Sequence, residues 1–359
     1  MSAAPVLIAA GGTGGHVFPA LAVAEALQAA AVPVVWLGTH AGLEARVVPA
    51  AGIEMEWLDV GGVRGKGWRT RLGAPAALAR ACWQALRVVR RRRPRALLGM
   101  GGFVAGPGGL VAPAVGCPLV IHEQNAVAGL TNRILARVAR RVLEAMPGTF
   151  PARARARAVG NPVRAAITAL PAPAERFAGR TGRPRLLVLG GSQGARALNE
   201  RLPRALARLS PDARPEVRHQ CGQRHVDTAR AAYAEAGVDA EVEPFIDDMA
   251  AAYGWADLVV GRAGAMSVWE LAGAGVGSLL VPFPHAVDDH QTANARWLEQ
   301  AGAAVIVQER ELDEARLARE LEILLGDRAG LLERARRARA LARPDAAATV
   351  AALVQEAAR

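Results

Sequence analysis

A histidine follows a glycine-rich turn close to the start of the chain. The turn is Gly11-Gly12-Thr13-Gly14-Gly15, and His16 comes next. An imidazole can take up or release a proton near neutral pH, so His16 is a candidate general base. The glycines let a ligand approach the backbone, and a helix that begins here would offer N–H groups. The segment therefore predicts a phosphate- or sugar-binding turn; a histidine that only caps its own helix is the alternative.

Four polar residues directly follow a later apolar segment. Residues 118–121 predict a strand, and His122-Glu123-Gln124-Asn125 come immediately after it. Ligands of α/β proteins bind at the carboxyl edge of a parallel sheet. We therefore expect these side chains to lie outside the core and at least one of them to be functional. Capping of a helix predicted from residue 130 to 139 is the alternative.

The strand, glycine turn and helix of the opening recur about half a chain later. Residues 185–189 predict a strand, the turn Gly190-Gly191-Ser192-Gln193-Gly194 follows, and residues 195–209 predict a helix. A proline-rich stretch at residues 144–184 separates the two halves and is typical of a domain boundary. We therefore predict an α/β protein with two similar domains, with a helical tail after Pro344 that crosses back to the first.

Composition limits the classes of partner. The 359 residues carry a formal net charge of +11, and Lys66 is the one lysine. This charge favours anionic partners, but scarce aromatic residues argue against a nucleic-acid stacking platform. The few, widely spaced cysteines (Cys82, Cys117 and Cys221) suit a reducing cytosol. The N-terminal apolar run predicts a core strand rather than a signal peptide, and no apolar stretch reaches the roughly 18 residues of a membrane span.

Several common sites are absent from the sequence. A dinucleotide fold would place an acid at the end of the second strand, where this chain has Gly38-Thr39-His40, and a third glycine where it has Val17. No turn has the Gly-Lys-Ser/Thr of a phosphate-binding loop, and Ser192 is not in a nucleophile elbow. Neither Asp247-Asp248 nor Asp288-Asp289 stands with a His or Cys at metal-ligand spacing, so we predict helix caps.

Two basic segments bear on the surface of the first domain. A helix predicted at residues 74–93 has apolar positions and ends in Arg90-Arg91-Arg92-Arg93. Arginines at a helix C-terminus are favourable in themselves, but an apolar stripe flanked by arginine also suits an anionic membrane. The glycine-rich loop at residues 61–67 is either a solvated connection or a contact for an anionic substrate.

The combination of motifs resembles the bacterial family of UDP-N-acetylglucosamine transferases that complete lipid II in peptidoglycan synthesis. The resemblance rests on these segments, in order: GGTGGHVFPALAVAEAL (11–27), VRGKG (63–67), LLGMGGFVAGPGG (97–109), HEQNAVAGLTN (122–132), VGNPVR (159–164), GGSQGARALN (190–199), FIDDMAAAY (245–253), RAGAMSVWE (262–270) and DDHQTANA (288–295). It implies a GT-B fold of two Rossmann-like domains with the active site in the cleft between them. It further implies inverting transfer of N-acetylglucosamine (GlcNAc) from UDP-GlcNAc to lipid I, with no metal or cofactor.

The resemblance also implies domains and site residues. An acceptor- and membrane-facing domain would span residues 1–163, with a helix at about 344–359 packed back on it, and a UDP-GlcNAc domain would span 164–343. His16 and Glu123 would be catalytic. Glu270 would bind the ribose, Ile246 the uracil, Gln291 and Asn294 the sugar, and Arg164 and Ser192 the nucleotide or diphosphate. The remaining donor contacts would be Thr13, Gly14, Gly15, Asn125, Ala265, Met266, Ser267, Val268 and Trp269.

The implied partners are UDP-GlcNAc, lipid I, the anionic cytoplasmic face of the inner membrane and cell-wall synthesis proteins, without nucleic acid. Because the acceptor is a membrane lipid, the resemblance strengthens the membrane interpretation of residues 74–93. Ala263 stands where we expect a hydroxyl residue, and Trp269 where we expect a small one. The alternatives are another GT-B enzyme, such as a glycolipid glycosyltransferase or a UDP-GlcNAc epimerase, and a non-catalytic nucleotide-sugar-binding or scaffold protein.

Overall fold

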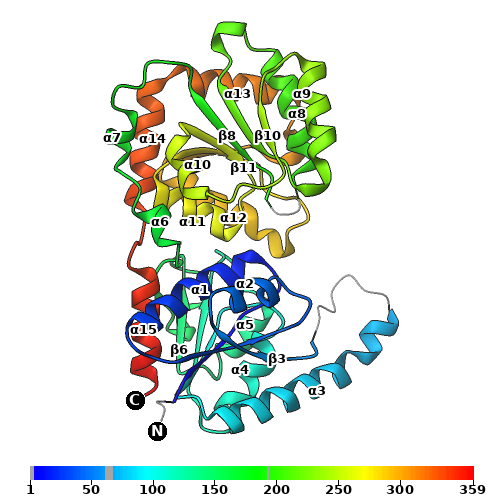
Figure 1. Cartoon of the computed structure of the whole chain (residues 1–359), viewed down its shortest axis with the longest axis vertical. Helices are drawn as coiled ribbons and strands as arrows, with labels where there is room; N and C mark the ends of the chain where they lie inside the picture. Colours follow the sequence, from blue (N-terminus) through cyan, green and yellow to red (C-terminus); the bar gives the residue numbers. More distant parts are fainter. Residues whose placement is uncertain (1–3, 61–67, 192–193) are drawn as a thin grey trace. The chain divides into compact units, whose positions relative to one another are not determined.

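The computed structural model describes residues 4–60, 68–191 and 194–359, with the backbone alone for residues 68–74. The chain divides into two compact units (Figure 1). Unit 1 comprises Met1–Arg164 and Arg343–Arg359, and unit 2 comprises Ala165–Ala342. The division follows Arg164, so this residue belongs to unit 1.

Unit 1 is built on a parallel sheet with the strand order β3-β2-β1-β4-β5-β6-β7. Its strands are β1 (Val6–Ala9), β2 (Val34–Gly38), β3 (Glu54–Trp57), β4 (Ala96–Gly99), β5 (Leu119–Glu123), β6 (Arg141–Glu144) and β7 (Arg157–Ala158). Its helices are α1 (Gly14–Ala29), α2 (Glu44–Ala50), α3 (Trp68–Arg92), α4 (Ala105–Ala114), α5 (Leu130–Leu135) and α15 (Ala346–Ala357).

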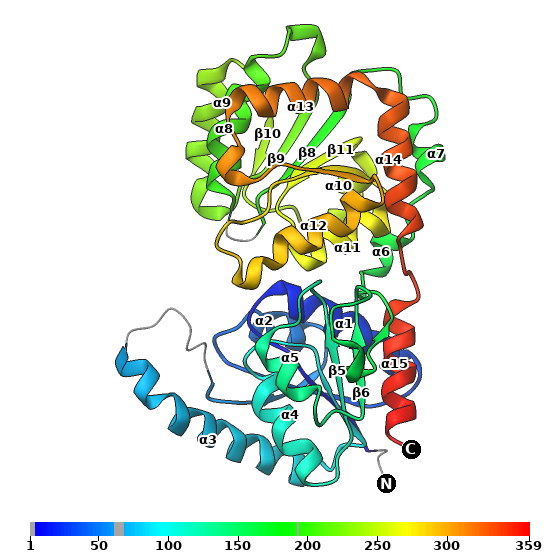
Figure 2. The same cartoon turned by 180° about the vertical axis from the view of Figure 1, so that it is seen from behind.

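The alternation of side chains in β1 explains the layers of unit 1. Val6 and Ile8 face a core formed with α1 and with Val350 and Val354 of α15. Leu7 and Ala9 point to the opposite face, where residues of α3 and α4 pack. Because both faces are covered, the strand is apolar throughout, as is typical of parallel sheets. Figures 1 and 2 show α15 lying beside α1 from both sides.

Helix α4 forms where the sequence shows a run of glycine and proline. Its residues include Gly106-Pro107-Gly108-Gly109, which would predict a turn on propensity alone. A Cβ at Gly108 would lie 3.1 Å from a Leu37 methyl, and one at Gly109 would lie 2.6 Å from Leu135. The small residues therefore let α4 approach the sheet and α5 closely, and this packing outweighs the poor helix propensity.

Unit 2 has a parallel sheet with the order β10-β9-β8-β11-β12-β13. Its strands are β8 (Arg185–Leu189), β9 (Glu216–Gln220), β10 (Glu241–Glu243), β11 (Leu258–Gly261), β12 (Gly277–Leu280) and β13 (Ala304–Ile306). Its helices are α6 (Ala165–Thr168), α7 (Pro173–Phe177), α8 (Arg196–Ala207), α9 (Val226–Ala236), α10 (Met249–Trp255), α11 (Ala265–Ala274), α12 (His290–Gln300), α13 (Glu314–Gly326) and α14 (Arg328–Ala340). Single-turn 3-10 helices lie at Ala152–Ala154 in unit 1 and at Pro211–Ala213, Gln223–His225, Val287–Asp289 and Glu309–Glu311 in unit 2.

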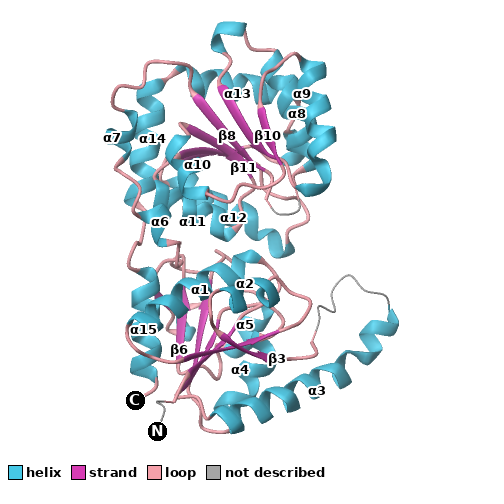
Figure 3. Ribbon diagram, viewed as in Figure 1, coloured by secondary structure: helices cyan, strands magenta, loops and turns pink. Residues whose placement is uncertain are grey.

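The two sheets share one topology. In each, the first strand pairs with the second on one side and with the fourth on the other, and the chain then proceeds outward. Figure 3 shows the strands of each unit in magenta and the helices in cyan. Helices α8, α9 and α13 contribute apolar residues to one core of unit 2. This order is that of a doubly wound, Rossmann-like sheet. The predicted α/β class with two Rossmann-like halves is confirmed.

Helix α3 ends in the arginine run, and part of that run has partners in the fold. Arg91 pairs with Glu56, and Arg92 pairs with both Glu54 and Glu56 of β3. These pairs attach the end of α3 to the edge of the sheet.

The loop at residues 61–67 lies outside the described residues. None of the described helices is long and apolar enough to cross a membrane.

Candidate functional site

His16 lies where three neighbouring strands of unit 1 end. It belongs to the first turn of α1, which follows β1, and its Nδ1 atom lies 3.1 Å from Oε1 of Gln124, just after β5. Nε2 of Gln124 donates to the carbonyl of Met100, just after β4, at 2.8 Å. A Cβ at Gly101 would lie 2.5 Å from Nδ1 of His16, so the ring packs against a position that only glycine fits.

The polar residues after strand 118–121 are more buried than the sequence suggests. His122 and Glu123 belong to β5 itself, and His122, Glu123 and Gln124 are all buried. The expectation that these three side chains lie outside the core was therefore wrong. Hydrogen bonds explain how the core accepts them: Nε2 of His122 donates to the carbonyl of Gly160 at 2.9 Å. Burial lowers the pKa of His122 to about 4, which keeps the ring neutral.

Both carboxylate oxygens of Glu123 bind the loop that leads to α5. Oε1 accepts from the backbone and side-chain nitrogens of Asn125, each at 3.1 Å. Oε2 accepts from Gly129 N at 3.0 Å and from Nδ2 of Asn132 at 2.9 Å. Glu123 therefore holds Asn125 and the start of α5 in place.

The other candidates in unit 1 gather around the start of α1. Thr13 occupies the helix N-cap, and Gly14 and Gly15 form its first residues. The guanidinium carbon of Arg164 lies 5.6 Å from the centre of the Phe18 ring. A Cβ at Gly14 would lie 2.9 Å from that ring. Arg164 is thereby placed within unit 1, close to the first turn of α1.

The candidate nucleotide residues of unit 2 lie on α11, which follows β11. Gly264 is the N-cap, and Ala265, Met266 and Ser267 form the first turn, at the positive end of the helix dipole. One turn further on, Glu270 is buried, and its Oε2 accepts from the hydroxyl of Tyr253 at 3.1 Å. A helix N-terminus suits a diphosphate, and a fixed carboxylate suits ribose hydroxyls.

Val268 and Trp269 face the interior of unit 2. Both side chains are buried, and the N–H of Val268 donates to the Gly264 carbonyl at 3.0 Å. The Trp269 ring packs on Trp297 with 4.4 Å between ring centroids. Trp297 thus fills the space beside Trp269, which stands where we expected a small residue. Ala263 is buried as well, and its carbonyl accepts from Nδ2 of Asn294 at 3.1 Å.

Three further candidates have different surroundings. Oε1 of Gln291 accepts from the N–H of Phe283 at 3.0 Å. Ile246 is buried beside the exposed Phe245. Ser192 lies outside the described residues. In the aspartate pair at 247–248, Asp248 caps α10 as predicted, because its Oδ1 accepts from Ala251 N at 2.9 Å. Asp289 occupies the N-cap position of α12, but its side chain makes no cap bond to the backbone and instead accepts from the hydroxyl of Thr292 at 2.7 Å, so the prediction of a side-chain cap is wrong for this pair.

Sequence reasoning missed the polar residues that hold the glycine turns. Glu44 accepts from Gly12 N at 2.9 Å in unit 1. Gln220, the last residue of β9, accepts from Gly191 N at 3.0 Å in unit 2 and donates to the carbonyls of Gly191 and Pro244. For Gln220, the available signal was an amide at the carboxyl end of a predicted strand. Glu44 had a weaker signal, an acidic residue shortly after Gly38 and Gly42.

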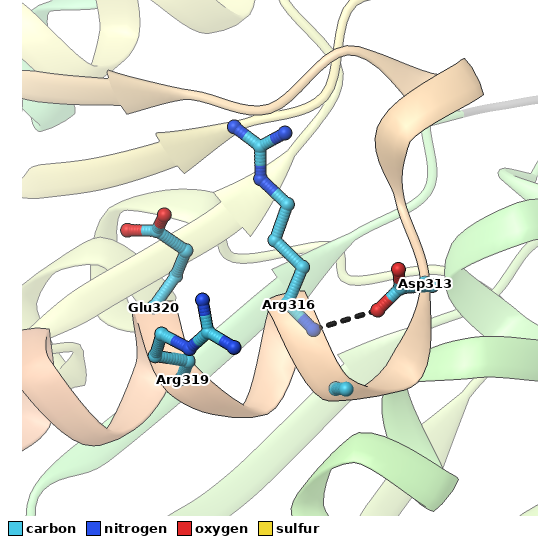
Figure 4. Close-up of a pocket in the computed structure, with 5 residues that line it drawn as sticks. Asp313, Arg316, Arg319 and Glu320 are labelled. Atoms are coloured by element: carbon cyan, nitrogen blue, oxygen red, sulfur yellow. Dashed lines mark hydrogen bonds between the residues drawn. The ribbon is translucent and has the colours of Figure 1, made fainter.

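A depression of about 430 Å³ also lies along α13 (Figure 4). Asp313, Ala315, Arg316, Arg319 and Glu320 line it. Asp313 accepts from the N–H of Arg316 at 2.7 Å and so serves as the cap of α13. None of the predicted site residues lines this depression, and we assign it no function.

Comparison with known proteins gives consistent matches along the chain. The glycosyltransferase family 28 N-terminal domain matches residues 6–144, and the C-terminal domain of the same family matches residues 185–350. A protein of Alkalilimnicola ehrlichii is 61% identical over 355 residues, which are 99% of each chain. A protein of Halorhodospira halophila is 56% identical over 357 residues, again 99% of each chain. Both are named UDP-N-acetylglucosamine--N-acetylmuramyl-(pentapeptide) pyrophosphoryl-undecaprenol N-acetylglucosamine transferase.

Solved structures agree with these matches. The crystal structure of Acinetobacter baumannii MurG has a TM-score of 0.84 at 44% identity, covering 98% of this chain and 99% of that one. The glycotransferase of kitacinnamycin has a TM-score of 0.71 at 18% identity, covering 98% of each chain, which shows a shared fold alone. The predicted two-domain GT-B fold is confirmed. The chain belongs to glycosyltransferase family 28, among the UDP-N-acetylglucosamine--N-acetylmuramyl-(pentapeptide) pyrophosphoryl-undecaprenol N-acetylglucosamine transferases.

Proposed function

We propose that the protein transfers GlcNAc from UDP-GlcNAc to lipid I with inversion at the anomeric carbon, forming lipid II and UDP. The names of its relatives supply the donor and acceptor classes. Two Rossmann-like units suit a nucleotide-sugar-dependent enzyme. An inverting transfer needs a base for the acceptor hydroxyl and stabilisation of the leaving UDP.

The hydrogen bond between His16 and Gln124 is the observation that carries the assignment of the base. Because Nε2 of Gln124 donates to Met100, its Oε1 faces His16 and accepts from Nδ1–H. In the neutral ring this leaves the lone pair on Nε2. Nε2 would take the proton of the acceptor hydroxyl as its oxygen forms the bond to the anomeric carbon and the bond to UDP breaks.

We assign Glu123 to positioning. Its two oxygens accept hydrogen bonds from Asn125, Gly129 and Asn132. A general base must reach the hydroxyl proton within hydrogen-bond distance, and the half-buried His16 is better placed than the buried Glu123. Asn125, oriented by Glu123, then contributes an amide for the sugar donor.

The donor contacts follow from the chemistry of each position. Glu270 binds the ribose, and the first turn of α11 binds the diphosphate and stabilises the charge on departing UDP. Gln291 offers its amide nitrogen to sugar hydroxyls, since Oε1 accepts from Phe283. Val268 and Trp269 support α11 by packing. The remaining proposed contacts are Thr13, Gly14, Gly15, Arg164, Ser192 and the backbone of Ile246.

We place the protein on the cytoplasmic face of the bacterial inner membrane, held by unit 1. Exposed apolar side chains occur on α3, on α4 and the residue after it, and on α5 with the turn after it: Leu78, Trp83, Leu110, Val115, Leu130, Ile134 and Val138. Helix α4 contacts both α3 and α5. Arginines accompany the apolar positions; the Arg87 guanidinium lies 4.8 Å from the Trp83 ring centroid. Apolar side chains among arginines suit an anionic bilayer, where the acceptor lipid resides.

Vesicle binding tests the membrane surface. Double substitution of Trp83→Ser and Ile134→Ser should weaken binding to phosphatidylglycerol-containing vesicles by about tenfold or more, because both apolar contacts are lost. Ile323→Ser removes an equally exposed apolar side chain from α13 in unit 2 and should leave binding unchanged. Equal binding by the double variant and the parent would refute this surface.

A product assay tests the transfer itself. Purified protein should transfer labelled GlcNAc from UDP-GlcNAc to a lipid I analogue and release one UDP per product. Epimerised UDP-sugar without transfer would indicate the epimerase alternative. Binding of UDP without any turnover would indicate a non-catalytic protein. Either outcome would overturn the proposed function.

A further inference from the structure

The carboxylate of Glu44 binds the backbone of the first glycine turn. Its side chain is fully buried at the start of α2. Oε2 accepts from Gly12 N at 2.9 Å, and Oε1 accepts from Thr39 N at 3.1 Å and from the Thr39 hydroxyl at 2.8 Å. One side chain thus joins the turn after β1 to the loop after β2.

Three glycines from separate places make room for this carboxylate. A Cβ at Gly11 would lie 2.5 Å from Oε1 of Glu44, and one at Gly38 would lie 2.9 Å from its Cγ. A Cβ at Gly42 would overlap both oxygens. The three glycines therefore leave space for the carboxyl group, and a side chain at any of these three positions would collide with Glu44.

The three donors around Glu44 suit a carboxylate better than an amide. Gly12 N–H, Thr39 N–H and the Thr39 hydroxyl all donate, and an ionised carboxylate is a pure acceptor. In a dinucleotide fold the N–H groups of this turn point at a phosphate. Here Glu44 accepts from the Gly12 N–H at 2.9 Å, so this N–H is not available to a ligand.

The second glycine turn is held differently. In unit 2, Gln220 accepts from Gly191 N and donates to the Gly191 carbonyl, both at 3.0 Å. Strands β2 and β9 occupy equivalent places, each beside the first strand of its sheet. The anchor near β2 is therefore anionic and the anchor on β9 is neutral.

We infer that Glu44 is a positioning residue for the transfer reaction, because it holds the turn that carries His16. This inference rests on the proposed function. Glu44 fixes Gly12, which lies two residues before α1 begins. Gln124 fixes the imidazole ring of His16, which lies in the first turn of α1. A displacement of about 1 Å in a reacting group can reduce a rate about 100-fold.

Kinetics of Glu44→Gln test this role. The amide would direct its NH2 toward N–H donors, so the turn should shift and kcat should fall about 100-fold. The affinity for UDP, measured by calorimetry, should change less than about twofold because Glu270 and α11 are unaltered. Glu44→Asp, which keeps the anion, should retain more kcat than Glu44→Gln. Asp257→Asn is the control: it also neutralises a buried carboxylate that accepts a backbone N–H, from Arg185, just before β11, and that carboxylate pairs in addition with Arg180.

Amide hydrogen exchange gives a readout independent of activity. In Glu44→Gln the amides of Gly12 and Thr39 should exchange faster than in the parent, and in Asp257→Asn they should not. A folded Glu44→Gln protein with near-parental kcat, or one that loses UDP affinity in proportion to kcat, would overturn the inference. If the parent does not glycosylate a lipid I analogue, the proposed function fails, and unchanged exchange at Gly12 would separately refute Glu44 as the anchor.

Discussion

The imidazole of His16 and the side-chain amide of Gln124 form a hydrogen bond, with 3.1 Å between Nδ1 and Oε1. Exchange of the oxygen and nitrogen positions of the Gln124 amide would break a hydrogen bond, because the amide nitrogen donates to the Met100 carbonyl at 2.8 Å. The Met100 carbonyl, just after β4, therefore determines which nitrogen of His16 carries the proton. The basic nitrogen is then Nε2, the one that suits a general base.

Gln124→Leu should remove the acceptor for Nδ1–H while preserving bulk. Both the tautomer and the ring orientation would then be less defined, and we expect kcat to fall about 10- to 100-fold. Affinity for UDP should be unchanged by calorimetry. Gln124→Glu, which keeps an acceptor, should lose less activity than Gln124→Leu. Equal activity of Gln124→Leu and the parent would show that the bond has no catalytic consequence.

Glu270→Ala should weaken UDP binding about 10- to 100-fold, since hydrogen bonds to a charged group contribute about 1.5–3 kcal/mol. Uridine should lose affinity by a similar factor, because it carries the same ribose. Tyr253→Phe removes the hydroxyl that donates to Oε2 of Glu270 and should have a smaller effect in the same direction. Unchanged calorimetric affinity in Glu270→Ala would exclude the ribose contact.

Glu123→Gln separates positioning from catalysis. In the variant an NH2 group would replace one of the two oxygens and would face N–H donors. The free energy of unfolding should therefore fall by about 3 kcal/mol. The control Glu356→Gln changes an exposed carboxylate on α15 that pairs with Arg141 and should have little effect on stability. A Glu123→Gln protein as stable as the parent but inactive would instead support Glu123 as the base.

Stability should decrease as the pH falls from about 6.5 toward 4. Burial lowers the pKa of His122 to about 4 and that of His219 to about 3. Below pH 6.5 the unfolded chain takes up protons at these positions and the native state does not, so protons favour unfolding. The expected slope is up to about 1.4 kcal/mol per pH unit for each histidine. Denaturation of His122→Asn and His219→Asn at several pH values should show a shallower slope in each.

The fold followed from periodicity and turns more readily than the site did. Apolar runs such as Val6–Ala9 and Arg185–Leu189, each before a glycine turn, predicted the first strand of each sheet along the chain. Helix α4 was hidden because its glycines serve close packing, which depends on the partner surface. The sequence also could not show that Glu123 is buried, since its donors at Asn125, Gly129 and Asn132 meet it only in the folded loop. Glu44 was missed for the same reason, because its partner Gly12 lies 32 residues away along the chain.

The central claim is that His16 is the base of GlcNAc transfer, and the kcat of His16→Ala tests it most directly. With UDP-GlcNAc and a lipid I analogue both saturating, kcat should fall about 100- to 10,000-fold. The calorimetric affinity for UDP should remain within about twofold of the parent, because the proposed nucleotide contacts lie mainly on α11. A His16→Ala protein whose kcat stays within a few-fold of the parent would contradict the mechanism.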